Sequence, residues 1–248
     1  MNYGLILQHR KYRHAGERRP SMRNVALSAI LLLFCAQAYG QGFLETDLSQ
    51  ENHPLGKERK GKPQELLSPD QITKEKNFFF VIGLGGGQFG YDAIQITEDG
   101  RGLFVYATYV EKQKDGGMLK EQVWWRATFS LLPEEMVALR QCLSENRGLL
   151  SQDQYHVDNL ADGTQVFVKL RVGAVTRTVY CNNHFPKTVQ AIHEFFKNRL
   201  GDKLRTAMSA AKQITLEELR KSEYAQLRSP GWVSAPQEGK SPPEKKNN

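Results

Sequence analysis

The sequence predicts an α+β domain: an antiparallel β-sheet of five to six strands with two helices on one of its faces. Three observations lead to this prediction. Short apolar runs rich in β-favouring residues are separated by glycine-containing turns. Two longer segments open with proline and repeat apolar residues at helical spacing. Because a sheet must bury its apolar side against another layer, we expect both helices on the same face.

Four strands are predicted in the first half of the domain. The continuous apolar run NFFFVIG indicates a buried strand that stops at glycines. Asp99 and Gly100 supply the positive φ that a tight hairpin turn needs, and Asp115-Gly116-Gly117 is a second turn. The predicted strands are residues 77–83, 93–97, 103–110 and 123–130.

The first half ends in a helix that begins at Pro133. Proline suits the first helical position, and the acidic residues after it suit the positive end of the helix dipole. Met136, Leu139 and Leu143 form the apolar stripe of this helix.

The second half repeats this order of strand, turn, strand and helix. Residues 165–172 and 174–181 are the strands, and the helix begins at Pro186. Its apolar stripe consists of Phe185, Val189, Ile192, Phe196 and Leu200. The order fits a doubled ββα unit, and it also fits an ordinary α+β domain without a repeat.

The first forty residues differ from the rest of the chain. Basic residues up to Arg23 precede the uncharged apolar run of residues 25–35, and small residues follow. This is the layout of a secretory signal peptide, and the apolar run is shorter than the roughly 20 residues of a membrane span. We therefore predict a secreted or periplasmic protein. Met22 opens a compact signal of its own, so we expect it to be the true initiator.

Small residues allow two cleavage positions. A cut after Ala38 leaves Tyr39 as the first residue, and a cut after Gly40 leaves Gln41. An uncleaved signal-anchor is the alternative interpretation. Beyond residue 40, composition separates four segments. They are a polar linker at 41–76 that we expect to be disordered, the domain at 77–200, a helical extension at 201–228 and a proline-rich disordered tail at 229–248. Within the extension, Thr215–Glu218 fits a capping box, which predicts a helix that begins there.

Most of the positive charge lies in the predicted signal peptide. The whole chain carries a net charge of +7, a value that would favour nucleic acid as a partner. Residues 1–40 contribute five of these charges, and the segment 41–199 has a net charge of −1. We therefore expect no nucleic-acid partner.

Several motifs match a chemical site only in part. Gly85–Gly90 reads G-x-G-x-x-G, but a phosphate site needs a helix next, and a strand is predicted there. Cys181 and His184 form a single Cys-x-x-His pair, and adding Cys142 and His193 does not give the ligand spacing of a zinc site. The pair also lacks the sequence context of a hydrolase dyad. We expect no metal, no cofactor and no catalytic residue.

Two cysteines, Cys142 and Cys181, follow the predicted signal peptide. In an oxidising compartment two cysteines can form one bridge, so we predict a disulfide between them. Two buried free thiols are the alternative.

The most informative side chains for binding are aromatic and basic residues on the predicted strands. If Trp125, Ala127 and Phe129 face the core, then Trp124, Arg126 and Thr128 face outwards. Such a surface suits a sugar ring, a peptide or a protein. The alternative is that the second helix or the C-terminal tail covers it. The candidate ligand-binding residues are Trp124, Arg126, Tyr106, Phe104, Lys169 and Arg171.

We therefore expect an extracytoplasmic binding module without catalytic activity, whose partner is a protein, a peptide or a glycan. No nucleophile–base spacing supports an enzyme. Two alternatives stay open: a small secreted hydrolase whose site is unassigned, and an envelope structural protein held by its signal-anchor. Once the signal is cleaved, no stable membrane span is expected.

Overall fold

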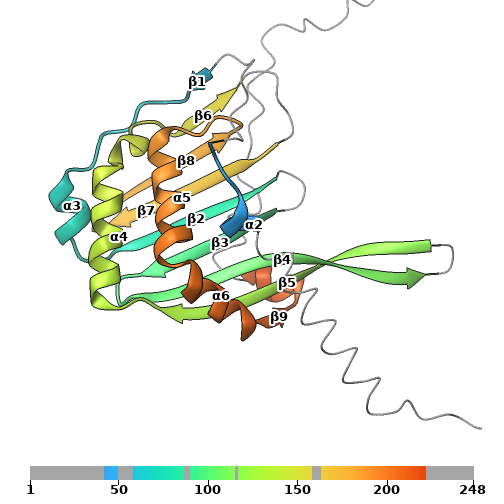
Figure 1. Cartoon of the computed structure of the whole chain (residues 1–248). Coiled ribbons are helices and arrows are strands. Elements are labelled where there is room, and N and C mark those ends of the chain that lie inside the picture. Colours follow the sequence, from blue (N-terminus) through green and yellow to red (C-terminus); the bar gives the residue numbers. More distant parts are fainter. Residues whose placement is uncertain (1–41, 50–57, 87–89, 115–116, 158–162, 222–248) are drawn as a thin grey trace, which may run out of the picture. The chain divides into compact units, whose positions relative to one another are not determined.

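One β-sheet, to which the described part of the chain contributes nine strands, forms the centre of the domain (Figure 1). The computed structural model describes residues 42–49, 58–86, 90–114, 117–157 and 163–221. Across the sheet the strand order is β1-β6-β8-β7-β2-β3-β4-β5-β9. The strands are β1 Glu58–Lys60, β2 Phe79–Gly86, β3 Gly90–Thr97, β4 Arg101–Lys114, β5 Gly117–Ser130, β6 Gln154–Val157, β7 Gln165–Val172, β8 Val175–Asn182 and β9 Lys212–Ile214.

Neighbouring strands are antiparallel except β6 and β8, which run parallel. The turn between β3 and β4 has Gly100 at φ +78°, as the Asp-Gly pair predicted. Gly173, at φ +57°, turns the chain between β7 and β8. These positive φ values explain why glycine stands at both turns.

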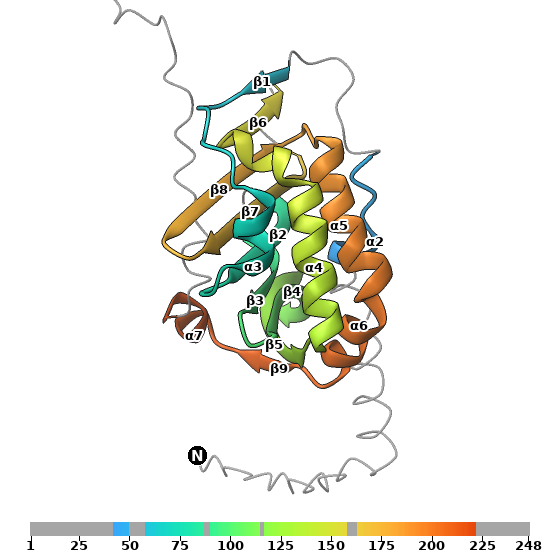
Figure 2. The ribbon, with the colours of Figure 1, turned by 90° about the vertical axis from the view of Figure 1, so that its left-hand side faces the viewer.

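The helices lie mainly on one face of the sheet. α4 and α5 run side by side there, whereas α7 lies on the opposite face (Figure 2). The helices are α2 Gly42–Glu45, α3 Pro69–Lys74, α4 Pro133–Glu145, the 3-10 helix η1 Arg147–Ser151, α5 Lys187–Arg199, α6 Gly201–Ser209 and α7 Leu216–Lys221. We call the face under α4 and α5 the helix face, and the opposite one the open face.

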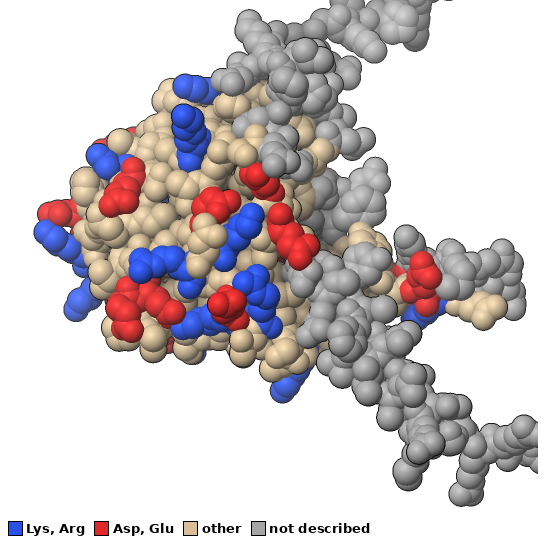
Figure 3. All heavy atoms as spheres, viewed as in Figure 1, with Lys and Arg blue, Asp and Glu red and all other residues tan. Residues whose placement is uncertain are grey.

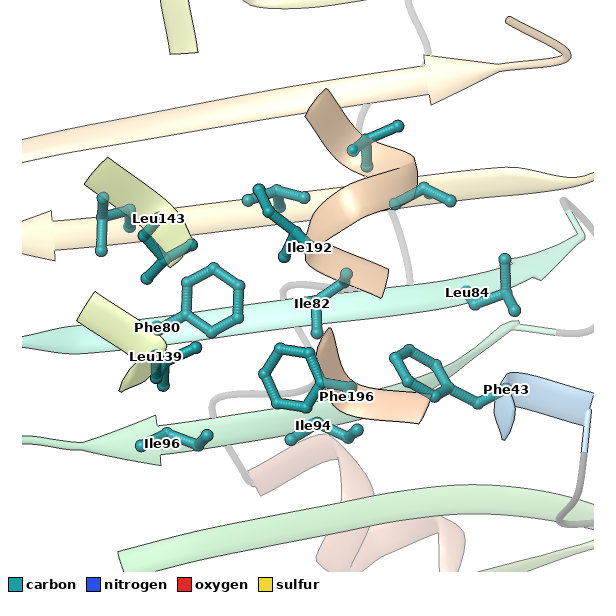
Figure 4. Close-up of a cluster of buried hydrophobic side chains, with 14 of the residues drawn as sticks. Phe43, Phe80, Ile82, Leu84, Ile94, Ile96, Leu139, Leu143, Ile192 and Phe196 are labelled. Carbon is teal, nitrogen blue, oxygen red and sulfur yellow. The ribbon is translucent and has the colours of Figure 1, made fainter. Parts of the chain in front are cut away.

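The main hydrophobic core lies between the sheet and the helix face (Figure 4). Leu139 and Leu143 of α4 are buried in it, and all five residues of the stripe predicted for α5 are buried. From β2, Phe80 stacks on Phe196 with ring centroids 5.8 Å apart. Burying side chains of this size contributes about 2 kcal/mol each, so this layer supplies most of the apolar stabilisation.

The prediction of a mixed α+β domain is confirmed, but its predicted count of five to six strands and two helices is wrong. The additional strands β1, β6 and β9 have three or four residues, too few to show a period. A strict doubled ββα unit is also wrong, because the four consecutive antiparallel strands β2 to β5 lead into α4 and β6 joins the second half in parallel.

The expected disordered linker at 41–76 is wrong for its described residues, because 42–49 and 58–76 are folded. Phe43, Leu44 and Leu48 are buried in the core. Ser68 opens α3 through a capping box with Gln71, and Arg140 of α4 donates to the carbonyls of Ile72 and Glu75 at 2.9 Å. A few anchoring residues thus order a segment whose average composition is polar. The expected tail at 229–248 lies outside the described residues.

The hairpin of β4 and β5 extends past its neighbours as a two-stranded arm (Figure 1). β3 pairs with β4 only up to Val105, and β9 pairs with β5 only at Trp124–Arg126. Tyr109–Lys114 and Gly117–Gln122 therefore pair only with each other among the described strands.

Candidate functional site

The open face of the sheet carries a cluster in which two basic side chains share one aromatic ring. Lys169 and Arg171 alternate with buried residues on β7, next to Phe79 of β2. The guanidinium carbon of Arg171 lies 5.0 Å from the centroid of Phe79, and the Lys169 Nζ lies 5.9 Å from it. Among the described residues, no carboxylate forms an ion pair with either cation. Both positive charges are therefore available on this face.

An open cavity of about 490 Å³ adjoins this cluster at the end of the sheet. It is lined by Asn77, Phe78, Thr97, Glu98, Asp99, Arg101 and Arg171. Asn77, at φ +58°, holds its walls together: its N–H donates to Glu98 Oε2 at 2.7 Å, and its amide Nδ2 donates to the Gly173 carbonyl at 3.1 Å.

The acidic side chains of the cavity are already engaged. Asp99 accepts a hydrogen bond from the Thr97 hydroxyl at 2.6 Å and forms an ion pair with Arg101 at 2.6 Å. These contacts, the Thr97 hydrogen bond first, lower the pKa of Asp99. Since Glu98 accepts the Asn77 N–H, Arg171 is the cavity's cation without an acidic partner among the described residues. The cavity therefore favours an anionic group beside Arg171.

Two of the six predicted binding residues lie on the wrong face. Phe104 and Tyr106 are buried in the main core, because the register pairs Tyr106 with Trp125 and Phe104 with Ala127. The hairpin closes with Lys114 opposite Gly117, so even-numbered residues of β4 share a face with odd-numbered residues of β5. The candidate set took even-numbered residues from both strands, which implies a register that is wrong by one residue and therefore places the β4 side chains on the other face.

Trp124 does lie on the open face, but it is only 5% exposed. Ile214 of β9 lies opposite it, and Leu219 of α7 belongs to the same small cluster. Trp124 is therefore covered, but by β9 and α7 and not by the second helix or the C-terminal tail that the alternative named. Arg126 is exposed on the same face, with Lys212 opposite it.

The predicted disulfide between Cys142 and Cys181 is not formed, and both cysteines are free thiols. Cys181 is fully buried in β8, and burial raises the pKa of its thiol. Cys142 on α4 is half-buried, its pKa is raised in the same way, and the Asn146 amide lies 3.8 Å from its sulfur. Because the thiolate is the reactive form, a raised pKa makes both thiols less reactive at neutral pH.

The remaining motifs do not converge on a chemical site. Gly90 begins strand β3, so the glycine motif at 85–90 precedes a strand, as predicted, and offers no helix N-terminus to a phosphate. Its residues 87–89 lie outside the described part. Across the described residues, no group of three or more His, Cys, Asp or Glu side chains has the arrangement of a metal site.

One partly buried acid was not predicted. Asp92 of β3 accepts the Ala107 N–H at 3.0 Å, and burial raises its pKa to about 7. The charge on Asp92 in turn contributes to the raised pKa of Tyr106 and Tyr109, although burial is the larger cause. No sequence pattern marks Asp92, because a single acid in a strand is usually solvent-exposed. The position of Phe79 on the open face, by contrast, could have been predicted, because alternate residues of a strand share a face and Val81 lies two residues further along the same apolar run.

Comparison with known proteins gives no match, either to a protein-family model or to a curated protein sequence. None of the helices formed by the described residues is long and apolar enough to cross a membrane.

Proposed function

We propose that this protein is an extracytoplasmic binding module without catalytic activity, and that it holds an acidic protein or peptide segment on the open face of its sheet. The observation that carries the proposal is the stacking of Lys169 and Arg171 on Phe79, with no acidic partner among the described residues. A basic group that is already held over an aromatic ring loses little further conformational freedom when it binds a carboxylate.

The neighbouring residues extend this surface. Arg126 adds an exposed cation further along the open face, and the cavity beside Arg171 offers room for a side chain. On the helix face, by contrast, basic and acidic side chains are interspersed (Figure 3). Interspersed charge of both signs steers no ligand of one sign, which favours the open face as the binding surface.

A protein or peptide suits this site better than a sugar ring. A sugar platform needs an exposed aromatic ring, whereas Phe79, Trp124 and Phe167 are each at most 6% exposed. The open face instead presents the cationic ends of Lys169, Arg171 and Arg126, while its exposed acids Glu217 and Glu218 lie on α7. Such a site recognises carboxylates, and it needs little exposed apolar area.

The test uses the mature chain and a fluorescent hexaglutamate peptide, with a hexalysine peptide as the reference of opposite charge. We expect binding of hexaglutamate that weakens as salt is added, and a loss of at least tenfold in affinity in Lys169→Ala/Arg171→Ala. Arg205→Ala is the matched control, because Arg205 and its ion-pair partner Asp202 both lie on α6 and not on β7. Equal binding by the two variants would overturn the proposal.

A sulfated glycan is the competing ligand, and the same assay separates it. Binding of a sulfated polysaccharide that survives Lys169→Ala/Arg171→Ala would place the site elsewhere. If the double variant abolishes binding of the glycan while hexaglutamate never binds, the acidic-peptide proposal fails and a glycan module takes its place.

A further inference from the structure

The C-terminal edge of the sheet is held by few contacts. β9 pairs with β5 over three residues, and α7, which follows it, has six residues and lies on the open face (Figure 2). A helix of this length is not stable on its own in water. We call β9 and α7 together the C-terminal cover, because Ile214 and Leu219 bury Trp124 beneath them. Small changes in local interactions therefore decide how firmly the cover docks.

One of the three residue pairs between β5 and β9 brings two positive charges together. Arg126 of β5 lies directly opposite Lys212 of β9, and both side chains are exposed. Both lie on the open face, because each is two residues from a member of the Trp124–Ile214 pair. Directly opposite residues of an antiparallel pair have Cβ atoms about 5 Å apart, and like charges placed there destabilise the pairing. The cover thus docks against a charge repulsion.

The described acids do not compensate this repulsion. None of them forms an ion pair with Arg126 or Lys212. Glu218 of α7 is engaged in its own helix cap, where its Oε2 accepts the Thr215 N–H at 2.7 Å and the Thr215 hydroxyl at 2.9 Å. A carboxylate supplied by a ligand and placed between the two cations would replace their repulsion by two attractive contacts.

The proposed ligand of the open face is long enough to supply this carboxylate. Arg126 on β5 and Lys169 on β7 are four strand spacings apart, a distance of about 19 Å. An extended segment of six residues measures about 20 Å. An acidic segment that binds Lys169 and Arg171 can therefore reach Arg126 and Lys212 with another of its carboxylates.

We propose that an acidic peptide segment on the open face also binds between Arg126 and Lys212, and that it thereby locks the C-terminal cover onto the sheet. The inference rests on the proposed function, to which it adds a second anion site and a coupling between the ligand and the cover. Such coupling is reciprocal, so the docked cover raises the affinity for the segment by the factor by which the segment favours docking.

Hydrogen exchange of the mature chain, followed by mass spectrometry, measures how firmly the cover docks. Saturating hexaglutamate should slow exchange at residues 212–221 about threefold or more, while the amides of α5 on the helix face serve as an unchanged reference. In Lys212→Gln the cover should exchange about two- to fivefold more slowly without ligand, because the like-charge pair is gone. Hexaglutamate should then add no further protection. Arg205→Ala is the matched control and should keep the full response.

Arg126→Gln gives an independent check, because it removes the other charge of the pair. If the two cations repel each other, the cover of Lys212→Gln/Arg126→Gln should be protected no more than that of either single variant. Unchanged exchange of the cover in a chain that binds hexaglutamate would overturn the inference and leave the proposed function standing. A response that persists in Lys212→Gln would do the same. If hexaglutamate does not bind the natural chain at all, the proposed function fails, and the inference fails with it.

Discussion

Ile214 of β9 lies directly opposite Trp124 of β5, on the open face of the sheet. Only three residues pair β9 to β5, and α7, which follows it, has six residues. A short C-terminal segment therefore buries one of the largest side chains of the open face. Leu219 completes this cover, and both Ile214 and Leu219 are less than 10% exposed.

Ile214→Asp should release this segment without unfolding the sheet. A carboxylate cannot be buried against Trp124 without a partner, so β9 should detach and Trp124 fluorescence should shift to the red. We expect a loss of roughly 1–3 kcal/mol in the free energy of unfolding. Gln213→Asp is the matched control, because Gln213 is exposed in the same strand. A shift of equal size in the control would show that Ile214 does not provide the cover.

The buried His193 should make stability depend on pH. Burial lowers its pKa, and the neutral ring donates its Nε2 hydrogen to the Phe43 carbonyl. The unfolded chain therefore binds more protons between the lowered pKa and the ordinary value near 6.5. The stability that neutral His193 contributes is complete above about pH 6.5 and falls as the pH drops through this window.

The comparison with His193→Phe isolates this effect. The Phe variant loses one hydrogen bond to a buried carbonyl, a cost of about 1–3 kcal/mol at pH 7.5. In urea unfolding, its disadvantage relative to the natural chain should shrink as the pH falls from 7 to 5. Other titrating groups cancel in the difference between the two proteins. A disadvantage that stays constant over this range would contradict the assignment.

The two thiols should react in a fixed order. Native protein that has not been treated with a reductant should titrate with a thiol reagent, Cys142 before Cys181, since Cys142 is half-buried and Cys181 is fully buried. Cys181 should react only as the protein unfolds. Cys142→Ser leaves the slow phase, and Cys181→Ser leaves the fast one. Absence of both phases until a reductant is added would reveal a disulfide.

Much of the fold follows from patterns that span a full period. The stripe of Val189, Ile192 and Phe196 and the turn at Asp99-Gly100 are encoded locally, and both predictions are confirmed. Short anchors are different. In the segment 42–49 three apolar residues decide whether the chain docks, and their docking depends on a tertiary cavity that no local pattern describes.

The candidate site was predictable to a similar degree. Lys169 and Arg171 were found because alternation in a strand fixes which side chains share a face. Phe104 and Tyr106 were misplaced because the face of one strand relative to the next depends on hairpin register, which the length of the turn determines. Asp92 could not be found, since its burial arises from α2 and β4, which are distant in sequence.

The arm of β4 and β5 should be dispensable for folding. From Val110 to Glu121 its strands pair only with each other among the described strands, and an isolated two-stranded hairpin is at best marginally stable in water. Replacing residues 110–121 by Asn-Gly joins Tyr109 to Gln122 through a two-residue turn that suits a hairpin. We expect the shortened chain to unfold cooperatively within roughly 2 °C of the full-length chain, because a surface change away from the core costs about 0.5 kcal/mol or less.

Lys112→Ala, which removes the arm's ion pair with Glu121, is a milder control and should be neutral. A large loss of stability in the shortened chain, with Lys112→Ala unaffected, would mean that the arm supports the sheet through contacts beyond its own pairing.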